Sequence, residues 1–134
     1  MRGYEELQHT ADVALRVWGR TLPELFVAAA EGMFALMGAP ERLDSERELE
    51  LEAEDLEALL VDWLNELIYL RDRYQELYSS FDVQVWPSWR LHGVARGGKA
   101  KPQGALIKAA TYHGLAIGRL EEGEGFVAEI VFDT

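Results

Sequence analysis

The sequence predicts an α+β fold in which two main helices pack on a largely antiparallel or mixed β-sheet, as a two-layer sandwich. Two observations support this prediction: two long segments carry apolar residues at helical spacing, and several shorter segments alternate apolar with polar residues. The chain has 134 residues, of which 49% are hydrophobic and 10% aromatic, which is enough for one core. We therefore expect a single domain spanning residues 1–134.

The first helix is expected to begin after Thr21 and to end before Gly38. Thr21 is a typical N-cap, Pro23 is tolerated in the first turn, and Glu24, three residues after the cap, completes a capping box. Gly38, followed by Pro40, ends the helix. Its core-facing residues are Leu22, Leu25, Phe26, Ala29, Met33, Leu36 and Met37.

The second helix is expected to run from its N-cap Asp55 to about Leu77. Its apolar stripe consists of Leu56, Leu59, Leu60, Trp63, Leu64, Leu67 and Ile68. The opposite face carries Glu57, Asp62, Asn65, Glu66 and Asp72. We favour a solvated acidic face here over a metal site formed by Asp62 and Glu66.

Alternation predicts one strand at residues 13–17 and another at residues 47–54. In the second strand Arg47 and Leu49 share a face, and a row of glutamates from Glu48 to Glu54 lies on the other face. Side chains two positions apart on an exposed strand diverge into water, so we expect this row to be solvated rather than to hold a cation.

Four more alternating segments follow, at residues 81–86, 90–95, 107–117 and 126–133. The glycine- and lysine-rich stretch at residues 96–104 is the main basic cluster of the chain. We favour a flexible loop over an RNA contact there, because the stretch is short and contains no aromatic residues.

Composition excludes several classes of function. The chain has no cysteine, so disulfides, thiolate metal sites and cysteine nucleophiles are excluded. No apolar run is long enough to span a membrane, and we expect a soluble, cytoplasmic protein. With 24 acidic and 13 basic residues the formal charge is −11, which disfavours extensive nucleic-acid binding. An acidic surface suits a basic protein partner or a divalent cation.

Motifs typical of enzymes are missing: there is no phosphate-binding glycine loop, no serine elbow and no HExxH sequence. The three histidines, His9, His92 and His113, lie in different segments and do not predict a zinc site. Asp12 precedes the first strand and Asp133 ends the last one, so their carboxylates could meet at a sheet rim and bind a hard cation. The alternative is that Asp12 forms a turn and Asp133 lies at a frayed end.

Three longer motifs bear a family resemblance. The segments HTADVALRVWGRTLPELFVAAAEGMFALM, DLEALLVDWLNELIYL and IKAATYHGLAI, followed by a last strand with a penultimate aspartate, resemble the archease family over nearly the whole chain. The resemblance implies an accessory protein of tRNA splicing and RNA repair. Such a protein activates the GTP-dependent, RtcB-type RNA ligase by promoting its guanylylation and multiple turnover, and itself catalyses no covalent step.

The resemblance also implies roles for individual residues. Asp12 and Asp133 would hold a divalent metal ion, with Ca, Mg and Mn all left open, and Lys108 would contact the partner or its nucleotide. We add the terminal carboxylate of Thr134 as a further ligand. His9 and His113 are expected beside the ligands.

One departure from the family pattern affects this site. The family often carries an acidic residue in the turn after the first helix, where this chain has Met37, Gly38, Ala39 and Pro40. Asp44 is the nearest acid downstream. The metal site would therefore use fewer protein oxygens.

The alternative function is an acidic, chaperone-like module that modulates RNA-modifying enzymes without metal, whereas a hydrolase is disfavoured for lack of a paired acid, base and nucleophile.

Overall fold

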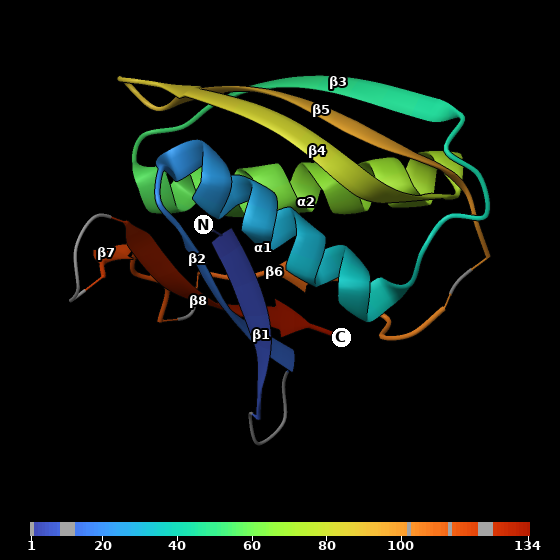
Figure 1. Cartoon of the computed structure of the whole chain (residues 1–134), viewed down its shortest axis with the longest axis horizontal. Helices are drawn as coiled ribbons and strands as arrows, with labels where there is room; N and C mark the ends of the chain where they lie inside the picture. The colour runs from blue at the N-terminus through green and yellow to red at the C-terminus, as the bar shows by residue number, and fades with distance from the viewer. Residues whose placement is uncertain (1, 9–12, 102, 113, 121–124) are drawn as a thin grey trace.

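The computed structural model describes residues 2–8, 13–101, 103–112, 114–120 and 125–134. In these residues two helices lie between two antiparallel sheets (Figure 1). One sheet has the order β1-β2-β8-β6, with β7 also paired to β8, and the other has the order β3-β5-β4. The elements are β1 (Arg2–Gln8), β2 (Val13–Gly19), α1 (Leu22–Met37), β3 (Ser45–Glu52), α2 (Leu56–Tyr74), β4 (Glu76–Trp86), β5 (Arg90–Lys99), β6 (Ala109–Ala110), β7 (Gly118–Arg119) and β8 (Phe126–Asp133).

The predicted α+β class, with helices packed on antiparallel strands, is confirmed. The strands divide between two sheets, and α1 packs against β1 and β2 on one side and β4 on the other. A helix between two sheets is buried on most sides, and α1 buries Val27, Ala28, Ala30 and Phe34 in addition to the predicted stripe.

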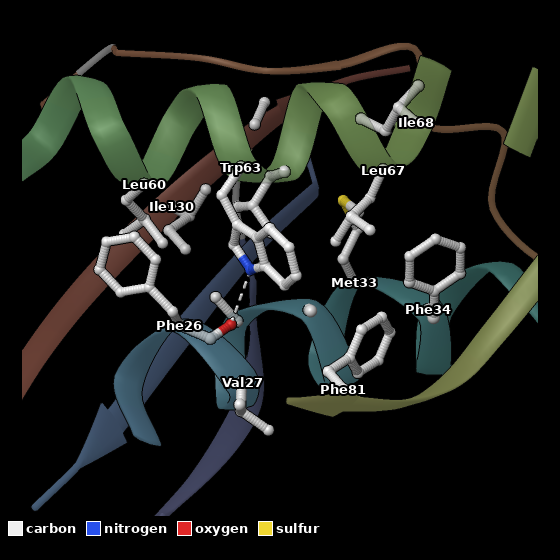
Figure 2. Close-up of a cluster of buried hydrophobic side chains, with 14 of the residues drawn as sticks. Phe26, Val27, Met33, Phe34, Leu60, Trp63, Leu67, Ile68, Phe81 and Ile130 are labelled. Atoms are coloured by element: carbon white, nitrogen blue, oxygen red, sulfur yellow. Dashed lines mark hydrogen bonds between the residues drawn. The ribbon is translucent and has the colours of Figure 1, made fainter. Parts of the chain in front are cut away.

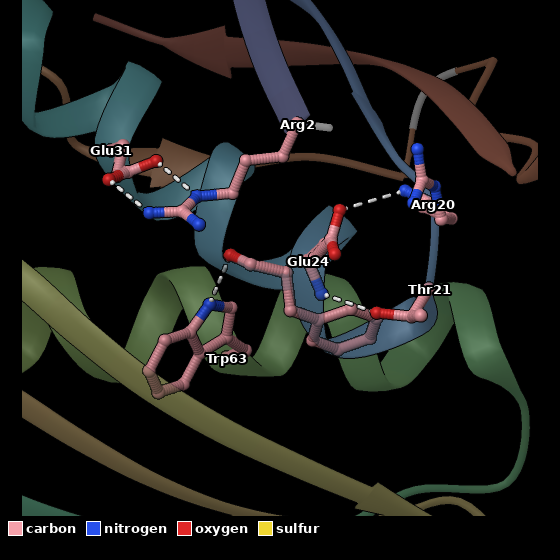
Figure 3. A network of polar contacts seen from close by, with 7 residues as sticks. Arg2, Arg20, Thr21, Glu24, Glu31 and Trp63 are labelled. Atoms are coloured by element: carbon pink, nitrogen blue, oxygen red, sulfur yellow. Dashed lines mark hydrogen bonds and ion pairs between the residues drawn. The ribbon is translucent and has the colours of Figure 1, made fainter.

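The start of α1 follows the capping prediction (Figure 3). The hydroxyl of Thr21 accepts a hydrogen bond from the main-chain N–H of Glu24 at 3.2 Å. The Glu24 carboxylate accepts from the N–H of Arg20 at 3.1 Å, one residue earlier than a standard capping box requires. Arg2 forms a two-point ion pair with Glu31, which attaches β1 to α1.

The core joins both helices to both sheets. Trp63 of α2 is completely buried, and its indole N–H donates to the carbonyl of Phe26 in α1 at 3.0 Å (Figure 2). Phe81 of β4 packs edge-on against Trp63, and Ile130 of β8 lies on the other side of the cluster. Burial of the indole therefore leaves no unpaired donor.

A buried ion pair connects β3 and β4. The Arg47 guanidinium donates to both oxygens of Glu76 at 2.9 Å, and Ser45 and Tyr78 donate to the same carboxylate at 2.5 and 2.7 Å. Burial alone would raise the pKa of Glu76, but these hydrogen bonds and the charge of Arg47 outweigh it and lower the pKa to about 2. Glu76 therefore remains charged inside the protein.

Two predictions of element boundaries were wrong. The second helix ends at Tyr74 instead of Leu77, because Gln75 adopts a left-handed C-cap and Glu76 begins β4. The predicted loop at residues 96–104 begins inside β5, which continues to Lys99. Gly97 permits this because the main chain of Leu77 and Tyr78 occupies the space that a Cβ would need.

The edges of the larger sheet also differ from expectation. β1 was not predicted, and it pairs with β2 along its whole length. The segment 107–117 was predicted as one strand, but of its described residues only Ala109 and Ala110 are in a strand, β6. Among the described residues, neither helix is long and apolar enough to cross a membrane.

Candidate functional site

The C-terminal end of β8 brings together two of the predicted site residues. Ala109 pairs with Asp133, and the main-chain N–H of Lys108 donates to the carbonyl of Asp133 at 2.8 Å. The side chains of Lys108, Asp133 and Thr134 are all exposed. Within the described residues, neither the Lys108 ammonium nor the Asp133 carboxylate has a hydrogen-bond or ion-pair partner. A cation and an anion that are unpaired within the described residues therefore lie at one rim of the sheet.

The strand that follows Asp12 reaches the same rim. Val13, the first residue of β2, pairs with Phe132, which precedes Asp133. The β8 strand therefore lies between β2 and β6 at this end of the sheet. His9, Asp12 and His113 lie outside the described residues, so their predicted roles remain predictions.

Helix α2 holds the segment that carries Lys108. The side-chain amide of Asn65 donates to the carbonyl of Ala110 at 3.2 Å and accepts from its N–H at 2.8 Å. The Glu57 carboxylate accepts from the N–H of Ile117 at 3.1 Å. The prediction of a solvated face for these residues was wrong, because both side chains are half-buried and bind the main chain of residues 110–117. Asn65 lies on the polar face of the helix, so the hydrophobic periodicity contained no signal for this contact.

The same helix face makes the surroundings of Tyr112 negative. Partial burial is the largest cause that raises the pKa of the Tyr112 phenol. The negative charges of Asp62 and Asp55 and a hydrogen bond with Asp62 raise this pKa further. Tyr112 is 56% exposed, so the phenol can be reached from solvent.

A second group of ligand-type side chains lies on the outer face of β3 and β5. The predicted alternation of β3 is confirmed, with Glu48 and Glu50 exposed. His92 of β5 pairs with Glu50, and its Nε2 lies 3.4 Å from a carboxylate oxygen of Glu48. Ligand atoms of these three residues all lie within 4.8 Å of one another, so they could bind a metal ion.

The turn after α1 offers no acidic side chain, as the sequence indicated. Gly38 has a φ of 120°, and a Cβ at this position would meet the side chain of Gln103. Asp44 is exposed and belongs to no group of three ligand-type side chains in the described part of the chain.

With this geometry established, comparison with known proteins identifies the family. Residues 4–134 match the model of the "Archease protein family (MTH1598/TM1083)". The chain belongs to the archease family. It is 40% identical to the archease of Methanopyrus kandleri over 97% of this chain and 98% of that protein, and 36% identical to the archease of Pyrococcus furiosus over 99% of both.

Solved structures of archeases share the fold. The solution structure of Methanobacterium thermoautotrophicum protein 1598 has a TM-score of 0.84 at 32% identity, covering 98% of this chain and 99% of that one. A crystal structure from Thermotoga maritima, described as an archease and possible chaperone, has a TM-score of 0.70 at 27% identity, covering 97% and 96%.

Proposed function

We propose that this archease is a non-enzymatic, cytoplasmic protein cofactor that activates a GTP-dependent RNA ligase in tRNA splicing or RNA repair. The observation that carries the proposal is the rim at the end of β8, where Lys108 and Asp133 are adjacent and exposed. Membership of the archease family supports the partner class. The protein promotes guanylylation and multiple turnover of the ligase and performs no covalent step itself.

Asp12, Asp133 and Thr134 form the metal site in this proposal. Carboxylate oxygens are the ligands preferred by hard divalent cations, so this donor set fits Ca, Mg or Mn. Val13 pairs with Phe132, so β2 begins at the end of β8 that carries Asp133. Two neighbouring carboxylates repel each other unless a cation or proton compensates. When bound, the metal would supply positive charge that stabilises phosphoryl oxygens of a nucleotide.

Lys108 acts beside this site by contacting the ligase or a phosphate of its nucleotide. The residue is exposed, while Asn65 and the pairing with Asp133 fix the main chain on both sides of it. A fixed main chain limits the entropy lost when the flexible lysine side chain binds. His9 and His113 are proposed to orient the ligands.

The proposal is tested by multiple-turnover RNA ligation with the cognate ligase and substoichiometric amounts of this protein. We expect stimulation by the wild type and a loss on the order of tenfold or more for Asp12→Asn and Asp133→Asn, because each removes a charged ligand. Glu129→Gln is the matched control, since it removes one exposed charge from the same strand. Folded aspartate variants that stimulate like the wild type would contradict the metal site.

A second function is favoured by one specific observation. The outer face of β3 presents a continuous row of exposed glutamates, Glu46 to Glu52, without an overlying element in the described residues. Such a face could bind basic regions of RNA-modifying enzymes without metal, as an acidic chaperone-like module. This function would be favoured if charge reversal on β3 lowered the stimulation of RNA ligation while Asp133→Asn left the stimulation unchanged.

A further inference from the structure

A pocket is lined by Met37, the last residue of α1, by Arg71 and Gln75 at the end of α2, and by residues of the segment after β5. Both helices end at the same side of the molecule (Figure 1). We call this pocket the helix-end pocket. Arg71 of α2 and Lys101 supply its cationic groups. Its apolar walls are formed by Met37, Leu77, Ala105 and Leu106.

Arg71 has unused hydrogen-bonding capacity in this pocket. Its side chain is only 16% exposed, and its Nε donates to the Asp72 carboxylate at 2.9 Å. A terminal nitrogen contacts the Met37 sulfur at 2.8 Å, and a thioether is a weak acceptor. Within the described residues Arg71 has no other side-chain partner. A guanidinium carries five N–H donors, so most of them remain available to a ligand.

The end of α2 does not cancel this positive charge. A helix C-terminus normally presents free carbonyls, which repel anions. Here the carbonyl of Arg71 accepts from the N–H of Gln75, and the carbonyl of Gln75 accepts from the N–H of Ala100 at 3.2 Å. The carbonyl of Tyr74 accepts from the Lys99 ammonium at 2.6 Å. The helix end is therefore already covered by donors.

The remaining charges also favour an anion. Glu76 lines the pocket, but its carboxylate is bound by Arg47, Ser45 and Tyr78. Lys101 is exposed and has no hydrogen-bond or ion-pair partner in the described part of the chain. Asp72 also lines the pocket and pairs with Arg71, so the two cations of the lining face two carboxylates, and both carboxylates are already bound by arginine.

The wall that faces α2 is attached to α1. The N–H of Ala105 donates to the carbonyl of Leu36 at 2.8 Å, and the side chain of Gln103 donates to the carbonyl of Ala39 at 3.2 Å. Leu106 follows directly and is 65% exposed at the rim. These contacts fix the wall, so the pocket exists before a ligand binds.

We propose that the helix-end pocket binds a small organic anion, with one carboxylate or phosphate group on a short apolar body. The acidic group accepts hydrogen bonds from Arg71 and Lys101, and the apolar body packs on Met37, Leu77 and Leu106. The proposal rests on this geometry alone and is independent of the proposed function. Leu106 lies two residues before Lys108, so a bound ligand also stabilises the segment that leads to the rim of β8.

The test is an NMR titration of the full-length, ¹⁵N-labelled chain with n-butyl phosphate and with butyrate. We expect saturable shifts of the amides of Arg71, Leu77, Ala100 and Ala105 with at least one of the two probes. The stronger probe identifies the acidic group. n-Butanol and inorganic phosphate should each bind on the order of tenfold more weakly, because each lacks half of the recognised chemistry. Absence of saturable shifts with both probes, or equal affinity for n-butanol, would overturn the proposal.

Two variants locate the binding. Arg71→Gln should raise the Kd on the order of tenfold or more, because it removes the charge-assisted hydrogen bonds. Arg73→Gln removes the same charge from the same helix turn, but its guanidinium lies over the Tyr74 ring, and its Kd should remain within about twofold. Equal weakening by both variants would overturn the site. If Arg71→Gln does not fold, Leu106→Ser at the exposed rim replaces it as the test. Leu106→Ser must weaken the binding of n-butyl phosphate more than the binding of inorganic phosphate, and an unchanged affinity for n-butyl phosphate would also overturn the site.

Discussion

Glu76 shows how a single charged residue can be stable in a protein core. Its carboxylate is 1% exposed and would be strongly destabilised alone, but four donor groups from Arg47, Ser45 and Tyr78 surround it. The ring of Tyr74 lies 3.5 Å from the Arg47 guanidinium carbon and covers the cation. Burial raises the pKa of Tyr78, the hydrogen bond with Glu76 raises it further, and the phenol therefore stays protonated as a donor.

Replacement of Glu76 by glutamine should lower the free energy of unfolding at pH 7 by about 3 kcal/mol. This follows from a pKa of about 2 in place of 4.5, at about 1.4 kcal/mol per unit. Because the folded pKa is lowered, the stabilisation is fully present above pH 4.5 and is lost as the pH falls toward 2. Urea unfolding at several pH values measures both effects.

The control for this prediction is Glu52→Gln, which neutralises an exposed glutamate of β3. It should change the free energy of unfolding by less than about 0.5 kcal/mol, as is usual for surface positions. If wild type and Glu76→Gln lose stability in parallel between pH 5 and 2, other carboxylates dominate the acid sensitivity and the account of Glu76 is wrong.

At the scale of elements, α2 positions the short edge strand that borders the site. β6 contains only two residues, so few ladder hydrogen bonds hold it to β8. Asn65 supplies two more bonds to Ala110 from the opposite side. The edge strand is therefore fixed by a helix side chain as well as by the sheet.

Asn65→Ala should destabilise the protein by about 1–3 kcal/mol, since it removes the partner of the N–H and carbonyl of Ala110, a buried residue. Hydrogen exchange of the Ala110 amide should accelerate more than exchange in the core of β8. Glu66→Ala, one residue along the helix, is the matched control and should leave Ala110 protected. Unchanged Ala110 protection in the Asn65 variant would show that β6 is held by the sheet alone.

Local signals predicted the helices and the alternating strands, but they did not predict the edges. Thr21 and Asp55 are caps that act within a few residues, so both helix starts were correct. β1 was missed because its pairing with β2 is made by the main chain, while Tyr4, Glu5 and Glu6 are exposed. Residues 107–117 alternate like a strand, but Asn65 and Glu57 bind their main chain.

The candidate site was predicted as a list of residues and not as a geometry. Lys108 and Asp133 are far apart in the chain, and their adjacency depends on which strands pair with β8. Periodicity indicates which face of a strand is buried but contains no information on strand order. For the same reason His92 could not be assigned to Glu48 and Glu50 before the pairing of β3 with β5 was known.

At the scale of the whole molecule, exposed glutamates are concentrated on one face of the smaller sheet, and three cationic side chains lie near the end of α2. The outer face of β3 carries exposed glutamates, whereas Arg71, Lys99 and Lys101 gather at the helix-end pocket and beside it. A chain with a formal charge of −11 attracts basic surfaces over distances that salt can screen. Encounter with a basic partner should therefore depend on the acidic face, and activation should depend on the rim of β8.

The association rate with the cognate RNA ligase should fall on the order of tenfold between about 0.05 and 0.5 M salt, because opposite charges steer the encounter. The triple variant Glu48→Gln, Glu50→Gln, Glu52→Gln should associate more slowly at low salt and show a weaker salt dependence. At saturating concentration it should still stimulate ligation, since Lys108 and Asp133 are unchanged. Asp133→Asn should show the opposite behaviour, with an association rate near that of the wild type and little stimulation.

Stopped-flow association measured beside ligation turnover separates the two steps. If the triple variant is folded, saturates the ligase and fails to stimulate, the acidic face itself acts on the partner and the chaperone-like function replaces the metal-dependent one.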